Sequence, residues 1–227
     1  MNKSIDFAAI IASSVHDMKN SLSMLMNMLE DISDLWHPTE QESRDKLDQL
    51  QYESKRLNSQ LVQLLTLYKI GNSQYLLNMS EQHVAEFLNE ATLHHREVFA
   101  RQGVTLSVDA PDDLIWYFDR TLIHGVINNV LNNAYKYTRS RVAITAAIDD
   151  GILVISVADD GSGYPQDMLD RGAQDQTGIN FESGSTGLGL FFSQKVAALH
   201  QHKQRTGSIR LDNGGFGGGG RFTILLP

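Results

Sequence analysis

A histidine and an aspartate stand side by side in SSVHDMKNSLSML, the segment of residues 13–25. Plotted at about 100° per residue, His16 lies about 130° from the apolar side of this predicted helix, among small and polar residues. Asp17 can accept one ring N–H and fix the tautomer, which leaves the other ring nitrogen as a nucleophile. The pair is therefore a candidate catalytic site. A buried core histidine and a plain exposed histidine are the alternatives for this segment alone.

Paired asparagines form a second candidate site in NNVLNNAYKYT, residues 128–138. Asn129 and Asn133 are four residues apart and face the same side of a helix, with Lys136 and Tyr137 one turn further on. Amide oxygens suit Mg²⁺, a hard ion that keeps several waters and bridges phosphates. An ordinary Asn-rich surface helix is an equally good interpretation of this segment by itself.

Two glycine-rich segments could add a ligand site. In VADDGSGYP, residues 157–165, Asp159 ends a predicted strand, and Gly161 and Gly163 allow a ligand to approach the backbone closely. A tight turn is the alternative there. In GSTGLGL, residues 184–190, three glycines precede a predicted helix, where free N–H groups and the helix dipole can bind phosphate. Each segment alone is weak support for a nucleotide site.

The N-terminal part of the chain must position the first of these groups. Its apolar residues have the spacing that is typical of packed helices. Apolar residues recur at alternating steps of four and three over residues 11–36 and, with one polar break, over residues 47–68. This pattern predicts two long helices with heptad seams. Two such helices bury both seams most economically as a homodimeric four-helix bundle. We therefore predict a dimerising helical hairpin over residues 3–72.

After Gly71 the pattern changes to short β-rich runs and amphipathic helices. The mixture predicts an α+β fold for residues 78–227, a two-layer α/β sandwich with helices over one face of a sheet. The run GGFGGGG, residues 214–220, is expected to be a flexible hairpin loop. Helices are predicted over 80–100, 119–138 and 189–201, and strands over 102–111, 141–148, 151–160, 207–214 and 220–227.

Composition excludes several classes of function. The 227 residues carry a formal net charge of -8, with a pI near 5.4, so no nucleic-acid or anionic-membrane partner is expected. The absence of cysteine excludes disulfides, thiolate metal sites and cysteine nucleophiles. No apolar run approaches the roughly 18 residues of a membrane span, and no signal peptide is found. A cytoplasmic location is therefore the default expectation.

Taken in order along the chain, these motifs resemble those of the sensor histidine kinases of two-component signalling. HDMKNSL is similar to the family's H box, NNVLNNAYKYT to its N box, DDGSGYP and STGLGL to its two glycine boxes, and GGGGRFTILLP to its closing strand. The resemblance covers nearly the whole chain. It implies a dimerisation and histidine-phosphotransfer hairpin and a Bergerat-type ATP-binding domain, with ATP and Mg²⁺ as cofactors. The implied partners are a second copy of the chain, a response-regulator receiver domain and, as a further candidate, a separate sensory protein.

The resemblance also implies roles for individual residues. His16 would be the phosphoacceptor, Asp17 would orient and activate it, and Asn20 is at the position used to dephosphorylate the regulator. Asn133 would hold Mg²⁺ with help from Asn129. An ATP lid would extend over roughly residues 164–186, with the glycines at its hinges. The implied nucleotide contacts are Asn129, Asn133, Lys136, Tyr137, Asp159, Gly161, Gly163, Thr186, Gly187, Leu188 and Gly189.

Four positions depart from the family pattern. Ser21 stands where the family usually has proline, which removes an expected helix kink. Asp160 replaces the usual Asn or Thr and adds charge near an anionic ligand. The phenylalanine-rich lid motif is reduced to Phe181, and the connection after His200 is longer and basic. None of these changes removes a reacting group.

Two other functions fit parts of the sequence. Gyrase- and MutL-like ATPases share the ATP-binding domain, but they activate water with a glutamate on the N-box helix. Asn129 stands at the equivalent position, where an amide cannot act as a base. A dimeric phosphotransfer or scaffold protein with a decayed nucleotide domain has no need of Asp159, Asn133 and the glycines. The leading hypothesis is an ATP-dependent protein-histidine kinase that phosphorylates His16 and then a regulator aspartate, with an additional phosphatase activity.

Overall fold

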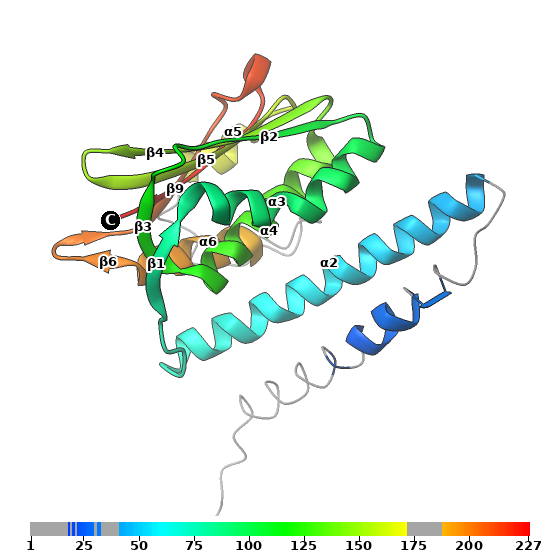
Figure 1. The fold of residues 1–227 in the computed structure, drawn as a ribbon, viewed down its shortest axis with the longest axis horizontal. Helices are drawn as coiled ribbons and strands as arrows, with labels where there is room; N and C mark the ends of the chain where they lie inside the picture. The colour runs from blue at the N-terminus through cyan, green and yellow to red at the C-terminus, as the bar shows by residue number, and fades with distance from the viewer. Residues whose placement is uncertain (1–17, 19, 21, 30, 33–40, 172–187) are drawn as a thin grey trace, which may run out of the picture. The chain divides into compact units, whose positions relative to one another are not determined.

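The computed structural model describes residues 18, 20, 22–29, 31–32, 41–171 and 188–227. The chain divides into two compact units, Met1–Leu76 and Leu77–Pro227. Figure 1 shows the elements of both units. Several residues singled out in the sequence lie outside the described part, namely His16, Asp17, Ser21, Phe181, Thr186 and Gly187.

The first unit is built from helix in its described part. Residues 22–29 and 31–32 are helical, and α2 spans Gln41–Gly71 (Figure 1), ending at the glycine where the sequence predicts a stop. Leu50, Leu57 and Leu64 recur every seven residues along α2, and their side chains are 53%, 47% and 40% exposed. A leucine seam at the surface fits packing against further helices, but the hairpin and its dimer stay predictions.

A five-stranded mixed sheet forms one layer of the second unit. The strand order is β2-β4-β5-β9-β8. β2 and β4 are parallel, and the other neighbours are antiparallel. The strands are β2 (Thr105–Asp109), β4 (Arg141–Asp149), β5 (Ile152–Asp159), β8 (Ser208–Asp212) and β9 (Arg221–Leu226).

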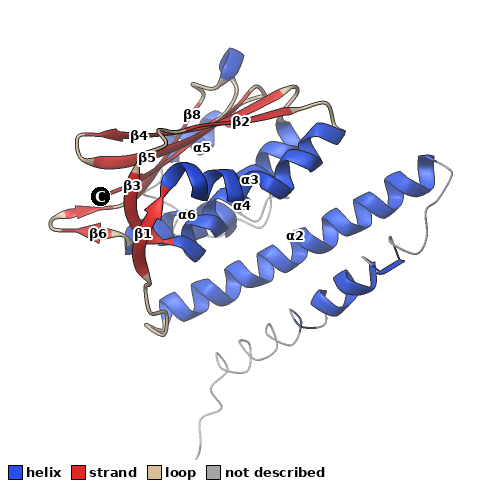
Figure 2. Cartoon of the chain, viewed as in Figure 1, coloured by secondary structure: helices blue, strands red, loops and turns tan. Residues whose placement is uncertain are grey.

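Three helices cover one face of this sheet and form the second layer (Figure 2). They are α3 (Val84–Arg101), α4 (Arg120–Tyr137) and α6 (Leu188–Leu199), and a short helix, α5, spans Gln166–Arg171. Alternate residues of β4, β5 and β9 point into the layer between sheet and helices, so the predicted two-layer α+β sandwich is confirmed. The core contains Phe87, Phe99, Ile123, Ile127, Leu131, Ile144, Ile155, Phe192, Val196, Phe222 and Ile224, each at most 3% exposed.

The second unit departs from the predicted elements at its start. The helix predicted from Ser80 is wrong over its first turn, because Met79–His83 form strand β1 and the helix begins at Val84. β1 pairs along its whole length with an antiparallel strand β3, Ile115–Asp119, which the pattern did not predict.

The basic connection after His200 also folds into a small hairpin, made of β6 (Gln201–His202) and β7 (Arg205–Thr206).

A buried polar network joins the start of α4 to the end of α6. Asp119 caps α4, because its Oδ1 accepts the Leu122 N–H at 3.0 Å and its Oδ2 accepts the Asn78 N–H at 2.9 Å. His200 Nε2 accepts the Asp119 N–H at 3.0 Å, and its Nδ1 donates to the Val196 carbonyl at 2.8 Å. Burial lowers the pKa of His200, so the ring is held neutral with its proton on Nδ1.

Among the helices of the described residues, none is both long enough and apolar enough to span a membrane.

Candidate nucleotide-binding site

Asp159 ends β5 on the helix-covered side of the sheet. It is in register with buried Val142 of β4, on the same face as Val157. Its Oδ1 accepts the backbone N–H groups of Gly161, at 2.7 Å, and of Gly220, at 3.2 Å. Within the described part of the chain, no hydrogen bond is made to its Oδ2. The carboxylate is therefore fixed through one oxygen and keeps the other as an acceptor.

The turn after Asp159 lies against the end of α4. A Cβ on Gly161 would stand 2.5 Å from the Tyr137 carbonyl oxygen, so no larger residue fits there. The next residue, Thr138, has a buried hydroxyl oxygen that makes no hydrogen bond to any described residue. A ligand or an ordered water beside Asp159 would satisfy such an orphaned group.

The other end of the site lies where α4 meets α6. A Cβ on Gly189 would stand 2.2 Å from Asn129 Oδ1, so the second residue of α6 packs directly on this amide. Asn129 is only 9% exposed, and its Nδ2 lies 3.5 Å from Ser193 Oγ, a long contact. Ser193 donates in turn to the Gly189 carbonyl at 2.8 Å. Asn129 thus links α4 to the first turn of α6.

Between these two ends, α4 presents polar side chains to solvent. Asn133 and Lys136 are exposed, and Tyr137 is 58% exposed. Tyr137 is eight residues after Asn129, a rise of about 12 Å along a helix, and this length separates the base of a nucleotide from its phosphates. The helix N-terminus at Leu188 adds the N–H groups and dipole that favour a phosphate. These features together fit an adenine nucleotide that lies along α4.

The structure brings most of the predicted contacts together around α4. Asp159 and Gly161 lie at the end of α4, and Gly189 packs against Asn129. Asn20 is an exposed helical residue of the first unit. Helix α4 carries Asn133, Lys136 and Tyr137 on its surface. Gly163 lies in the turn after β5 and has a φ of +73°. Helix α6 begins at Leu188.

Asp160 has a different role from the one the sequence suggested. Its carboxylate accepts the N–H groups of Arg139, Ser140 and Arg141, at 2.9, 3.1 and 3.3 Å, and the Ser140 hydroxyl at 2.5 Å. Burial alone would raise the pKa of Asp160, but these hydrogen bonds hold it well below its ordinary value. Asp160 therefore fastens the start of β4 to the end of β5, and its charge is directed at backbone donors.

Tyr164 is a further residue of the site that the sequence analysis missed. The residue is half-buried and its ring lies beside Gly220; burial, with the charges of Asp159 and Asp212 nearby, raises the pKa of its hydroxyl. Its backbone N–H and carbonyl both bond to Asn213, at 2.7 and 3.1 Å. A large residue directly after the second glycine was the only signal in the sequence.

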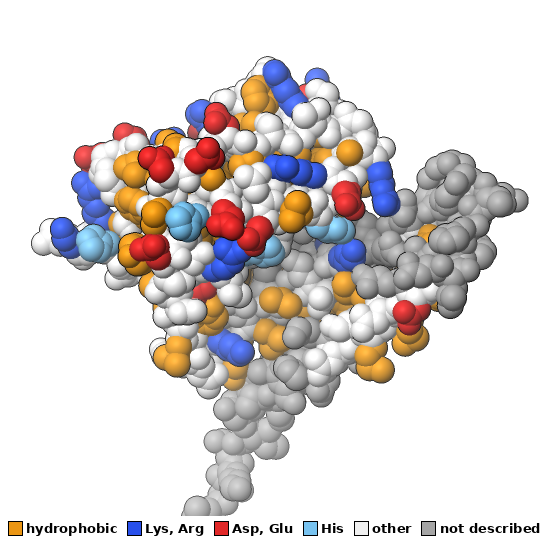
Figure 3. Space-filling view, in the orientation of Figure 1, with side chains coloured by type: hydrophobic (Ala, Val, Ile, Leu, Met, Phe, Trp, Pro, Cys, Tyr) orange, Lys and Arg blue, Asp and Glu red, His pale blue; other side chains and the backbone are white. Residues whose placement is uncertain are grey.

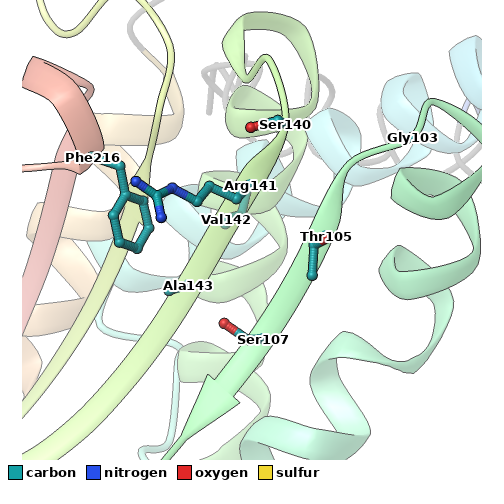
Figure 4. A pocket seen from close by; sticks show the side chains of 8 residues that line it. All are labelled: Gly103, Thr105, Ser107, Ser140, Arg141, Val142, Ala143 and Phe216. Carbon is teal, nitrogen blue, oxygen red and sulfur yellow. The ribbon is translucent and has the colours of Figure 1, made fainter.

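A separate groove of about 490 Å³ lies on the solvent face of the sheet, away from α4 (Figure 4). Thr105, Ser107 and Arg141 line it, and the Arg141 guanidinium lies 3.9 Å from the centre of the Phe216 ring. The surface of the second unit otherwise mixes acidic, basic and apolar side chains on the face drawn in Figure 3. The groove faces away from Asp159 and is not part of the candidate nucleotide site.

Sequence comparison gives the class of protein. Residues 118–227 match the family of histidine kinase-, DNA gyrase B-, and HSP90-like ATPases. Over 223 residues the chain is 26% identical to the sensor protein SrrB of Staphylococcus aureus strain N315, in a match that covers 96% of this chain and 37% of SrrB. The chain thus spans little more than a third of the length of the curated relatives it matches.

Solved structures of histidine kinases share the fold. The Acinetobacter baumannii histidine kinase AdeS matches with a TM-score of 0.60 at 20% identity, over 93% of this chain and 96% of its own. The catalytic domain of histidine kinase ThkA matches with a TM-score of 0.57 at 22% identity, over 66% of this chain and 97% of its own. Full-length ShkA in complex with AMPPNP gives 0.66 at 20% identity, over 96% of this chain and 45% of its own.

The chain is therefore a homologue of the sensor histidine kinases. Its second unit has the fold of their catalytic domains, and the match to the family of histidine kinase-, DNA gyrase B-, and HSP90-like ATPases covers residues 118–227.

Proposed function

We propose that this chain is an ATP-dependent protein-histidine kinase that phosphorylates His16. The observation that carries the proposal is the environment of Asp159. Two backbone N–H groups hold one of its carboxylate oxygens, and the other oxygen has no protein partner within the described residues. An acceptor fixed in this way suits the exocyclic amine of adenine. The homology to sensor histidine kinases supports a phosphotransferase role for a nucleotide bound here.

The proposed nucleotide extends from Asp159 along α4 to the start of α6. Asn133 would hold Mg²⁺ through its amide oxygen, and Lys136 would lie near the phosphates. Asn129 would assist mainly by fixing Gly189 and the first turn of α6, because its own amide is buried against that glycine. When bound, Mg²⁺ would offset the negative charge of the phosphates during transfer.

His16 is proposed to be the nucleophile. One ring nitrogen of His16 would form a bond to the γ-phosphorus while the bond to the departing ADP oxygen breaks. Asp17 would hold the other ring nitrogen and support the positive charge that develops on the imidazole. The phosphoryl group would then pass to an aspartate of a response-regulator receiver domain. Asn20, one helical turn after His16, would position water for the reverse task of dephosphorylating that regulator.

The first unit is proposed to form a homodimer in the cytoplasm. The exposed leucines of α2, spaced by seven residues, support this, because a surface seam of that kind is buried when helices pair. A four-helix bundle from two chains would place two copies of His16 on its outer surface. A separate sensory protein is a further proposed partner.

Incubation with γ-labelled ATP tests the proposal directly. The wild type should acquire label that is lost in acid and stable in base, as expected of phosphohistidine. His16→Gln should keep nucleotide binding and lose the label, and Asp159→Asn should bind ATP much more weakly and acquire much less label. Steady ATP hydrolysis with no labelled protein would instead favour a gyrase-like ATPase. Absence of ATP binding by the wild type would leave only the scaffold function.

A further inference from the structure

The loop between β8 and β9, residues 213–220, packs tightly on the end of β5. A Cβ on Gly219 would stand 2.1 Å from the Asp159 carbonyl oxygen, and one on Gly215 would stand 2.5 Å from the same atom. Asp159 N–H donates to the Gly220 carbonyl at 2.9 Å, and Gly220 N–H donates back to Asp159 Oδ1 at 3.2 Å. The loop joins the antiparallel strands β8 and β9, as expected of a hairpin loop. Its glycines permit a close approach of two backbones.

Asn213 adds a two-point contact at the other side of the same turn. Its Oδ1 accepts the Tyr164 N–H at 2.7 Å, and its Nδ2 donates to the Tyr164 carbonyl at 3.1 Å. The amide thus pairs with the backbone of Tyr164 as a neighbouring strand would. A Cβ on Gly163, whose φ is +73°, would stand 2.8 Å from Asn213 Oδ1. The chain is therefore fixed on both sides of Gly161, and Tyr164, where the expected lid begins, is held by Asn213.

The loop is anchored at its base and at its tip. At the base, Arg221 pairs with Asp212 Oδ1 at 2.8 Å, and that oxygen also accepts the Gly214 N–H at 2.7 Å. At the tip, the 3-10 turn η2, Phe216–Gly218, places Phe216 under the Arg141 guanidinium (Figure 4). These protein contacts hold the loop against the turn after β5.

We propose that Asn213 is a positioning residue for nucleotide recognition, acting through Asp159. This inference rests on the proposed function, because it assumes that Asp159 reads adenine. Asn213 fixes Tyr164, and the loop that begins at Asn213 fixes Asp159 Oδ1, so the free Oδ2 is held in one direction. Without Asn213 the turn after β5 can shift, and the carboxylate loses its orientation while the rest of the site on α4 is unchanged.

The test compares ATP with GTP. ATP has an exocyclic amine that would donate a hydrogen bond to Asp159, and GTP has a carbonyl oxygen at the same position of the base. Asn213→Ala should weaken binding of a non-hydrolysable ATP analogue about three- to tenfold. Binding of the matching GTP analogue should be unchanged, so the preference for ATP falls by the same factor. Asn89→Ala is the matched control, because Asn89 also bonds backbone in the second unit but lies on α3, outside the site. It should leave both affinities unchanged.

A double-mutant cycle and a milder variant distinguish a loss of nucleotide recognition from a folding defect. In an Asp159→Asn background, Asn213→Ala should have no further effect on ATP affinity, because the two residues act on one contact. Phe216→Ala, at the partly exposed tip, should lower the ATP preference about twofold with an unchanged melting temperature. Equal losses for ATP and GTP analogues, or additive losses in the cycle, would overturn the inference. A wild type that binds no ATP would instead overturn the proposed function itself.

Discussion

The two faces of the sheet meet at the end of β5, where adjacent aspartates have opposite surroundings. On the helix side, Asp159 has one oxygen fixed by backbone and one oxygen free of protein partners in the described part of the chain. On the other side, both oxygens of Asp160 accept hydrogen bonds from Arg139, Ser140 and Arg141. A carboxylate whose acceptors are all occupied serves the fold, and one with an acceptor left over can serve a ligand.

Replacing each aspartate with asparagine should separate these two roles. The larger effect on nucleotide binding is expected at Asp159. Asp159→Asn places an amide donor where the adenine amine needs an acceptor, and a mispaired buried polar group costs about 1–3 kcal/mol. Binding of a non-hydrolysable ATP analogue should weaken by about ten- to a hundredfold, as measured by calorimetry. Asp160→Asn is the matched control and should keep the affinity within about threefold. Equal losses in the two variants would mean that the faces are not distinct.

At the other end of the helix side, Gly189→Ala should give the next largest effect. The added Cβ would overlap the Asn129 amide, so either that amide or the first turn of α6 must move, and overpacking of this kind costs about 1–3 kcal/mol. We expect about tenfold weaker binding of the ATP analogue, and a smaller change for adenosine, because the proposed adenine contact is at Asp159. Gly71→Ala is the control, since among the described residues nothing beyond its own stretch of helix lies within 4 Å of its added Cβ. A similar loss for adenosine would place Gly189 near the base instead.

The same comparison shows what local sequence could predict. Asp159, Gly161 and Gly163 were found because a strand followed by glycines is a local pattern. The helices α3, α4 and α6 and the sheet strands β2, β4, β5, β8 and β9 were found because their apolar periods are local as well. The free acceptor on Asp159 and the contact of Asn129 with Gly189 could not be predicted, because each depends on residues far away in the chain.

The errors had the same physical origin. β1 was assigned to a helix because MSEQH has no clear alternation, and only its pairing with β3 makes it a strand. The run of glycines at residues 214–220 is typical of a flexible linker, yet here it allows two backbones to touch. Asp160 was expected to add charge near a ligand, because the hydrogen-bond donors at residues 139–141 are about twenty positions away.

Asp160→Asn should lower the free energy of unfolding. The loss should be smaller than the loss of binding free energy expected for Asp159→Asn and Gly189→Ala. The amide keeps one acceptor oxygen but turns a donor toward Ser140, which already donates. Because the group is partly exposed, solvent screens the loss, and we expect about 1 kcal/mol, or a fall of about 2–4 °C in melting temperature. Thermal unfolding of the nucleotide-free protein measures this. Ser140→Ala, which removes only the hydroxyl, should cost less, and a larger loss for Ser140→Ala would contradict the assignment.

The two faces of the sheet should also differ in their response to acid. The pKa of Asp160 lies below its ordinary value, so its contribution to stability is present above that ordinary value and is lost only as the pH falls through the lowered pKa. Burial lowers the pKa of His200, and also those of His95 and His124 on α3 and α4. The unfolded chain therefore binds protons first as the pH falls below about 6.5, and the helix side loses stability there.

Urea unfolding at pH 7.5, 6.5 and 5.5 should show this loss, at most about 1.4 kcal/mol per pH unit for each histidine. Trp116 on β3 is a fluorescence probe of the second unit once Trp36 is replaced by Phe. His200→Gln should be less stable at pH 7.5, because the bond to the Asp119 N–H is lost or weakened, and its stability should fall less steeply toward pH 5.5. Asp160→Asn should keep the wild-type slope, since Asp160 does not titrate in this range. A slope that disappears in Asp160→Asn and persists in His200→Gln would reverse the assignment of the two faces.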